Sequence, residues 1–172
     1  NAMQKRMEQN NKQMMQRDLE SLEEQQKRME ESIERTMELF KQMKVDQKTQ
    51  ELIKKLDDMQ ERQEKMNEQL EDADSQQEQN ELSEKQEELE KDMEDIKQDL
   101  DELKDLKNDT KTPDESQMDD LKQDAGDTQQ EMNDASQQMQ QGKKSKADNA
   151  QKNASDKMQE MKEQLSQMQM NS

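Results

Sequence analysis

Pairs of neighbouring carboxylates are the groups in this chain best suited to chemistry. They occur at Asp57–Asp58, Glu87–Glu88 and Asp119–Asp120. Two carboxylates can act as acid and base when a pocket separates their pKa values. The sequence contains no His and no Cys, so the commonest general base, the thiol nucleophile and the strong zinc ligands are absent. Because each pair lies on the polar face of a helical pattern, we expect solvated helix surfaces, and we predict that the chain is not an enzyme.

Alternating polar residues at Asp72, Asp74 and Gln76 resemble the start of a calcium-binding loop. No Gly follows to allow the sharp turn, and the spacing of the closing Glu of an EF-hand is not met. We therefore predict that Glu71–Asn80 is a solvent-exposed loop, in which Ser75 and Glu78 form a capping box. We expect neither a cofactor nor a metal cage. Ca²⁺ or Mg²⁺ could associate only weakly, as counterions along the acidic middle of the chain.

The composition restricts the fold to a helical one. Of the 172 residues, 24% are hydrophobic and 42% are charged, against about 45–50% and about 25% in typical globular domains. Most residues are strong helix formers, and the apolar residues repeat every seven positions, a period that a disordered chain does not need. We predict an all-α fold, an elongated helical bundle of coiled-coil hairpins with about five helices and no strands.

The net charge of −18 narrows the range of partners. Direct binding of nucleic acid is not expected, because the chain offers no basic surface that could displace phosphate counterions. No run approaches the ~20 apolar residues of a membrane span, so we expect a soluble fragment that does not itself insert into a membrane. Asn1 and Ala2 resemble the remnant of an expression tag, and residues 1–2 are excluded from functional interpretation.

The densest apolar cluster lies between residues 29 and 45 and includes the only aromatic residue of the chain. Its members share or flank one face of a helix, and we identify them as a candidate interaction stripe: Met29, Ile33, Met37, Phe40 and Met43. Flexible Met side chains suit a surface that adapts to partner helices. They also suit a loosely filled core, and we expect the narrower stripes of the other helices to pack around this one.

Residues 3–112 are predicted to form long helices that include an acidic coiled-coil hairpin. The heptad track through Met43 slips by two positions before it resumes at Leu52. A single straight seam cannot absorb such a slip without a bend, so we predict a turn between Val45 and Gln50. A continuous but distorted helix is the alternative. The clearest heptads are expected in the helix over residues 81–107, where the apolar track is Leu82, Leu89, Ile96 and Leu103.

Residues 113–172 are predicted to form a C-terminal helical hairpin that turns at Gly142, either separate from residues 3–112 or continuous with them in one bundle. Thr112 is the expected N-cap, with Pro113 in the first helical position. Gly142 suits a left-handed C-cap, and Ser145 is the expected N-cap of the next helix. An antiparallel hairpin would place Met139 near Ala147 and Met132 near Ala154.

Two stretches of the sequence, TMELFKQMKVDQKTQELIKKLDDMQERQEKMNEQLED and GKKSKADNAQKNASDKMQEMKEQL, carry a resemblance to a known family. They resemble the long hydrophilic helical region of a domain-of-unknown-function family of large, membrane-anchored bacterial proteins found in Bacteroidetes. The matching positions of its Gly-led helix are Gly142, Ala147, Ala150, Gln151 and Ala154. The resemblance covers residues 29–170 and implies a membrane anchor outside this fragment. It brings no activity and no functional residue, and the compartment stays undetermined.

Two functions are compatible with this pattern. The first is a non-catalytic structural or scaffolding coiled-coil module of a larger protein. The alternative is a protein-interaction module whose Met- and Leu-lined groove binds a partner helix. Complete internal burial of the apolar residues would favour the first function, and an exposed contiguous patch would favour the second. Because few apolar residues serve each helix, we also predict a weak homodimer through the first helix, promoted by salt that screens the net charge.

Overall fold

The computed structural model describes residues 1–170, and nearly all of them are helical. The elements are α1 (Ala2–Glu71), α2 (Gln76–Asn108), α3 (Glu115–Gln140) and α4 (Lys144–Met170). Within residues 1–170 no strand is present. The all-α prediction is therefore confirmed. The chain divides into two units, Asn1–Phe40 and the part that begins at Lys41.

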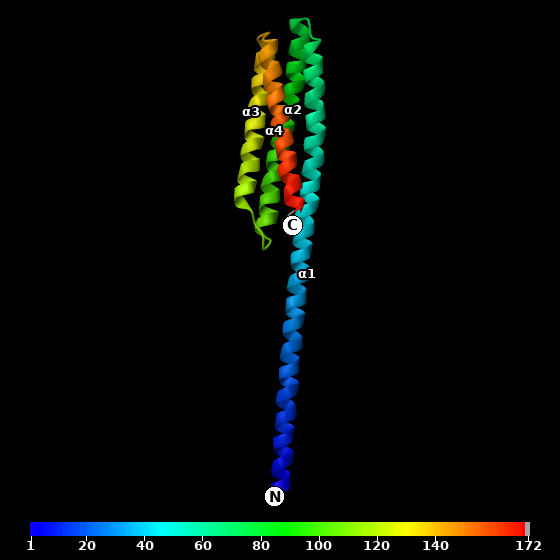
Figure 1. The fold of residues 1–172 in the computed structure, drawn as a ribbon, viewed down its shortest axis with the longest axis vertical. Coiled ribbons are helices and arrows are strands. Elements are labelled where there is room, and N and C mark those ends of the chain that lie inside the picture. Colours follow the sequence, from blue (N-terminus) through cyan, green and yellow to red (C-terminus); the bar gives the residue numbers. More distant parts are fainter. Residues whose placement is uncertain (171–172) are drawn as a thin grey trace. The chain divides into compact units, whose positions relative to one another are not determined.

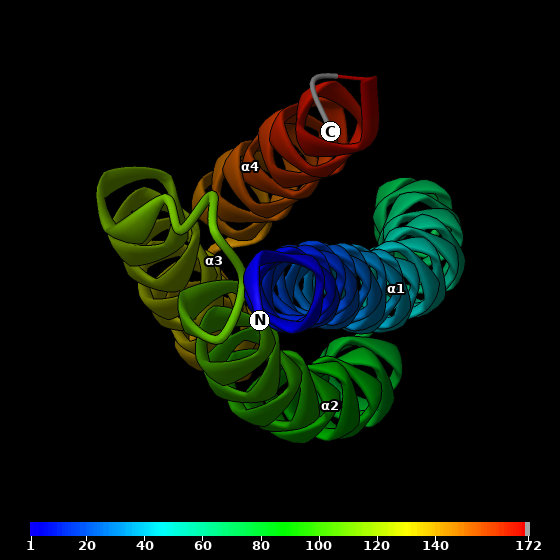
Figure 2. The same ribbon diagram turned by 90° about the horizontal axis from the view of Figure 1, so that it is seen from below.

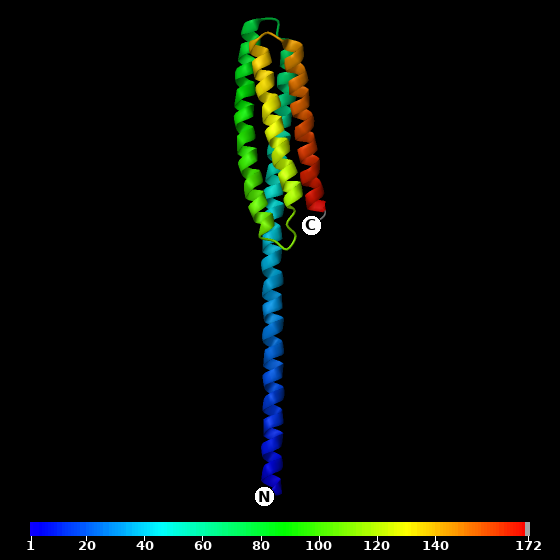
Figure 3. The same cartoon turned by 90° about the vertical axis from the view of Figure 1, so that its left-hand side faces the viewer.

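The second unit is an antiparallel four-helix bundle. It consists of the C-terminal part of α1 together with α2, α3 and α4, which lie side by side (Figures 1 and 3). The connections are short, over residues 72–75, 109–114 and 141–143, as expected for neighbouring helices that run in opposite directions. Seen end-on, α2, α3 and α4 follow one another around the bundle (Figure 2).

Each helix of the bundle contributes one heptad seam to the core. The buried residues of α1 are spaced alternately by four and three positions, and they begin only at residue 45: Val45, Thr49, Leu52, Leu56, Met59, Gln63, Met66 and Leu70. In α2 the predicted track of Leu82, Leu89, Ile96 and Leu103 is buried throughout. This spacing keeps one face of each helix towards its neighbours, as in a coiled coil.

The predicted turn between Val45 and Gln50 is wrong, because α1 continues through it without a break. The first two expected helices are one helix, so residues 1–170 form four helices, close to the predicted number of about five. A turn would be needed only if both heptad phases belonged to one packed seam. In the structure only the later phase, from Val45 onward, is buried within the bundle, so no bend is needed to reconcile the two phases.

The prediction that the other helices pack around residues 29–45 is also wrong. Of the predicted cluster only Val45 is buried, whereas Met29, Ile33 and Phe40 are all more than half exposed. Helix lengths supply the reason. α1 has 70 residues, but α2, α3 and α4 have 33, 26 and 27. Helices of that length can cover only about half of α1 at 1.5 Å per residue.

Helix starts follow the predictions in part. The backbone N–H of Glu78 donates to Oγ of Ser75 at 3.2 Å, which makes Ser75 the N-cap of α2 and forms half of the predicted capping box. The carboxylate of Glu78 accepts from the N–H of Asp74 at 3.0 Å. The predicted loop over Glu71–Asn80 is too long, because α2 begins at Gln76. The N-cap of α3 is Asp114, whose carboxylate accepts from the N–H of Gln117. The prediction that Thr112 caps this helix with Pro113 in its first position is wrong, because α3 begins at Glu115. The hydroxyl of Thr112 instead accepts a hydrogen bond from the amide of Gln42 on α1, a tertiary contact that local sequence cannot show.

The turn at Gly142 confirms the predicted hairpin. Gly142 has φ of 72°, and the N–H groups of Lys143 and Gly142 donate to the carbonyls of Gln138 and Met139. This is the Schellman pattern, in which a left-handed residue ends a helix. Met139 then shares a buried cluster with Ala147, and Met132 shares the larger cluster with Ala154.

The predicted N-cap Ser145 is wrong, because α4 already begins at Lys144. Lys144 extends its side chain instead, and its Nζ donates to the carbonyl of Glu71 at 2.6 Å. This contact ties the end of α1 to the start of α4, so the two turns at this end of the bundle support each other.

Candidate interaction surfaces

The carboxylate pairs lie on the exposed surface of the bundle, as predicted. Both members of Asp57–Asp58, Glu87–Glu88 and Asp119–Asp120 are exposed. Asp57 accepts from Nζ of Lys162 at 2.9 Å, and Asp119 accepts from Nζ of Lys104 at the same distance. These pairs therefore link neighbouring helices across the surface. In the described part of the chain, no cluster of acidic side chains has the arrangement of a metal site.

One group of charges between α1 and α2 is partly withdrawn from solvent, with Asp99 and Lys48 shielded and Lys55 exposed. The carboxylate of Asp99 on α2 accepts from Nζ of Lys55 at 2.6 Å and from Nζ of Lys48 at 3.1 Å, both on α1. Burial opposes ionisation of Asp99, but the hydrogen bonds from Lys55 and Lys48 outweigh it and hold its pKa below the usual value. The same carboxylate raises the pKa of Lys55. Opposite charges satisfy one another here, so the group fixes α1 against α2 and offers no free acid or base.

A layer of buried glutamines crosses the core. Nε2 of Gln63 on α1 donates to Oε1 of Gln86 on α2 at 2.8 Å, and Nε2 of Gln86 donates back at 2.7 Å. Gln151 on α4 donates to the same Oε1 of Gln86 at 3.1 Å. Gln63 and Gln86 both lie at heptad seam positions of their helices. A polar side chain at such a position favours the helix register in which its hydrogen bonds are made.

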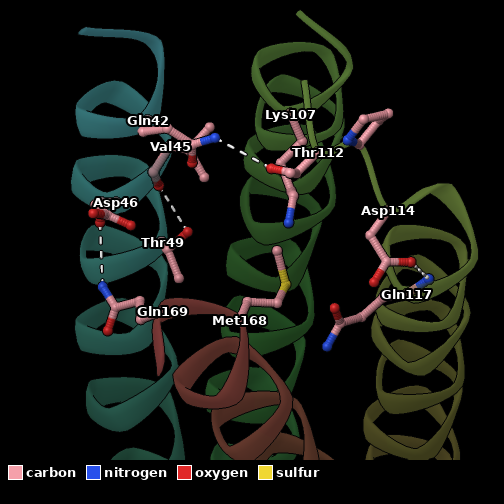
Figure 4. A pocket seen from close by; sticks show the side chains of 11 residues that line it. Gln42, Val45, Asp46, Thr49, Lys107, Thr112, Asp114, Gln117, Met168 and Gln169 are labelled. Carbon is pink, nitrogen blue, oxygen red and sulfur yellow. Dashed lines mark hydrogen bonds between the residues drawn. The ribbon is translucent and has the colours of Figure 1, made fainter. Parts of the chain in front are cut away.

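A small cavity of about 220 Å³ lies at the end of the bundle that holds the α2–α3 connection. Val45, Pro113 and Met168 form part of its wall, and polar side chains from all four helices and the connection form the rest (Figure 4). Gln169 donates to the carbonyl of Asp46 across its edge. The charged side chains of the wall are Asp46, Lys107 and Asp114.

The members of the candidate interaction stripe that lie in the first unit, residues 1–40, are all exposed. Met29, Ile33, Met37 and Phe40 have exposed fractions of 65%, 55%, 53% and 61%. Met43, in the second unit, is exposed as well. The structure extends the stripe towards the N-terminus, because further large apolar residues at the same heptad positions are exposed: Met15, Leu19 and Leu22. We call Met15, Leu19, Leu22, Met29, Ile33 and Phe40 the arm stripe.

Two polar residues interrupt the arm stripe at the same heptad spacing, Gln26 and Thr36. The hydroxyl of Thr36 donates to the carbonyl of Ser32 at 2.9 Å. The buried threonines of the bundle do the same, since Thr49 donates to Val45 at 2.7 Å and Thr128 to Asp124 at 2.6 Å. A hydroxyl that is satisfied within its own helix can be buried without losing a hydrogen bond. The arm stripe therefore has the composition of the seams that this chain buries.

No helix of the described residues is long and apolar enough to span a lipid bilayer. Comparisons of the chain with protein-family models, with curated proteins and with solved structures find no match. The assignment of a function therefore depends on the physical character of the two units.

Proposed function

We propose that this chain is a non-catalytic structural module that joins a larger assembly through a partner helix bound along the arm stripe. The bundle is the self-sufficient part, and residues 1–40 are the binding part. The observation that carries the proposal is the row of six large apolar side chains at heptad spacing, each between 55% and 65% exposed. Single exposed apolar residues are ordinary, but a row of them along one face of a helix is typical of an interaction site.

The bundle needs no further partner to bury its apolar residues. Its core contains large side chains from α1, α2 and α3 that are less than 2% exposed, among them Leu56, Leu100 and Met132. Residues of α4 complete the same core, including Met158, Met161 and Leu165. This unit therefore resembles a scaffold, whose apolar residues are used internally, and the arm stripe is the contiguous patch that favours an interaction role.

For residues 1–40 the situation is reversed, because the large apolar side chains of the arm stripe are exposed and do not stabilise the helix by packing. Isolated helices gain little stability in water, and most helical stability in proteins comes from packing an amphipathic face. Burying a large apolar side chain contributes about 1.5–3 kcal/mol. A partner that covers the arm stripe would thus stabilise the helix that it binds.

Site-specific photo-crosslinking tests this proposal. A photoreactive amino acid is placed at position 33 in the arm stripe, and in a matched variant at position 31, which lies on the opposite helix face. The proteins are then illuminated in an extract of the cells from which the sequence comes. We expect adducts with one defined protein, either this chain or another, from position 33 and few from position 31. Equal yields from both positions would contradict the proposal.

A further inference from the structure

We propose that the helix bound along the arm stripe is that of a second copy of this chain, in a parallel and in-register two-helix coiled coil over residues 15–40. This inference rests on the proposed function, because it names the partner of the same surface. The spacing assigns the core positions of the heptads. Position a is occupied by Leu19, Gln26, Ile33 and Phe40, and position d by Met15, Leu22, Met29 and Thr36.

Gln26 selects the partner and its orientation. An amide buried in an apolar seam needs a hydrogen-bonding partner. In a parallel, in-register pair Gln26 meets Gln26 of the second copy, and the two amides can satisfy each other. Gln63 and Gln86 show this exchange inside the bundle, with hydrogen bonds of 2.8 and 2.7 Å in the two directions.

Other alignments of two copies lose this exchange or oppose apolar seam residues with charged ones. An antiparallel pair centred on Gln26 keeps the exchange, as the antiparallel helices of Gln63 and Gln86 do, but it places Leu22 against Glu30 and Met29 against Glu23. A shift of the parallel pair by one heptad places Gln26 against Leu19 or Ile33. In the antiparallel registers in which position a faces position d, Gln26 meets Leu22, Met29 or Thr36. The last two arrangements oppose the amide with an apolar side chain or with a hydroxyl already bonded to its own helix. The unmatched amides disfavour them, as a single polar a position does in other coiled coils.

The charges agree with a second copy and also limit its affinity. Residues 1–40 carry nine acidic and seven basic side chains, so they are close to neutral, whereas the remaining residues carry 36 acidic and 20 basic. The segment can therefore approach its own copy without strong repulsion. In the parallel pair, Asp18 at position g faces Glu23 at position e of the second copy, twice by symmetry. This repulsion predicts a weak dimer that salt strengthens.

Disulfide formation in the full chain tests the arrangement, since the sequence has no native Cys. Met15→Cys and Met29→Cys lie at d positions 14 residues apart, and Glu31→Cys at position f is the control. Both d variants should oxidise to covalent dimers at least about tenfold faster than the control. An antiparallel dimer could bring only one of the two pairs together, because the other would then lie about 42 Å apart along the helices. Selectivity for one position alone, or for neither, would overturn the proposal.

A charge variant tests the same model without cysteine. Asp18→Lys converts the repulsive contact with Glu23 into an attractive one, and it should lower the dissociation constant about fivefold at low salt. Glu24→Lys makes nearly the same change at the outward position f and should have a much smaller effect. Sedimentation equilibrium at low and high salt measures both. Equal effects of the two variants would contradict the parallel pairing.

The disulfide and photo-crosslinking experiments together distinguish failure of the self-pairing from failure of the proposed function. A purified chain that stays monomeric, with all three cysteines equally slow, would overturn the self-pairing. The proposed function would still stand if position 33 photo-crosslinks to a different protein in the extract. If neither position 33 nor the d-position cysteines form selective crosslinks, both proposals fail.

Discussion

Residues 1–40 and the bundle that begins at Lys41 contain the same kind of helix in two different situations. Both carry Met, Leu and Ile at alternating spacings of three and four, interrupted by Gln and Thr. In the bundle those positions are buried, with Leu52, Leu56 and Leu100 at 0% exposure, whereas Leu22 in the first unit is 56% exposed. A heptad pattern thus indicates that a helix face is apolar, and the lengths of the neighbouring helices decide whether that face is covered within the chain.

The largest contrast is expected for truncation of a leucine in each unit. Leu100→Ala should lower the free energy of unfolding of the bundle by about 2–5 kcal/mol, because it removes buried methyl groups and leaves a cavity. Leu22→Ala should change it by less than about 0.5 kcal/mol, as surface substitutions usually do. Urea denaturation followed by circular dichroism, on dilute protein, measures both. A similar loss for both variants would mean that the arm stripe is part of the bundle core.

Glutamines at seam positions extend the comparison to polar side chains, with Gln86 in the bundle and Gln26 in the first unit. Gln86→Leu removes the Oε1 that accepts from Gln63 and Gln151 and the Nε2 that donates to Gln63, so it should cost about 1–3 kcal/mol through unsatisfied buried amides. Gln26→Leu should leave bundle stability unchanged and strengthen self-association, with a loss of the parallel preference. Denaturation and sedimentation measured on the same two proteins give both results. A stable bundle in Gln86→Leu would show that the glutamine layer does not contribute as described.

The buried charges of the bundle predict a dependence on pH. Because the pKa of Asp99 is depressed in the folded state, its contribution is present above the unfolded value of about 4 and is lost as the pH falls through the folded value. Asp99→Asn should therefore lower stability at neutral pH by about 1–2 kcal/mol and flatten the acid limb of a stability–pH curve. The matched change Glu31→Gln, on the exposed helix, should preserve that limb. An unaltered acid limb in Asp99→Asn would assign it to other carboxylates.

The two glycines of the bundle predict effects of opposite sign. A Cβ at Gly142 would lie 2.7 Å from Oε1 of Gln76, and the backbone is left-handed. Gly142→Ala should therefore cost about 1–2 kcal/mol. Gly126 is inside α3, and a Cβ at this position would have open space for 4 Å around it, so Gly126→Ala should stabilise by about 0.5–1 kcal/mol. Thermal unfolding distinguishes them, and a stabilised Gly142→Ala would contradict the described turn.

The smallest effect is expected from removing the first unit altogether. Deletion of residues 1–40 should change the unfolding free energy of the bundle by less than about 0.5 kcal/mol, because its buried residues begin at Val45. The same deletion should abolish self-association. Denaturation and sedimentation of the shortened protein test both statements together, and a large loss of bundle stability would show that the units are coupled.

Much of the bundle could be predicted because its determinants are local. The seams through Leu52 and Leu82 follow from spacing, and the turn at Gly142 follows from the only residue type that accepts its backbone angle without strain. The cap of α3 could not be predicted in this way. Thr112 and Asp114 are both good capping residues, and in the structure Asp114 caps α3 while Thr112 accepts a hydrogen bond from Gln42, 70 positions away.

The candidate stripe shows the same division. Sequence alone determined that this protein is helical, that Met29, Ile33 and Phe40 lie along one helix, and that no His or Cys is available for chemistry. Only the tertiary structure decided that the strongest apolar stripe stays uncovered and that α1 continues without a break through the change of heptad phase. The physical reason is that periodicity describes one helix at a time, whereas burial depends on how much of that helix its partners are long enough to reach.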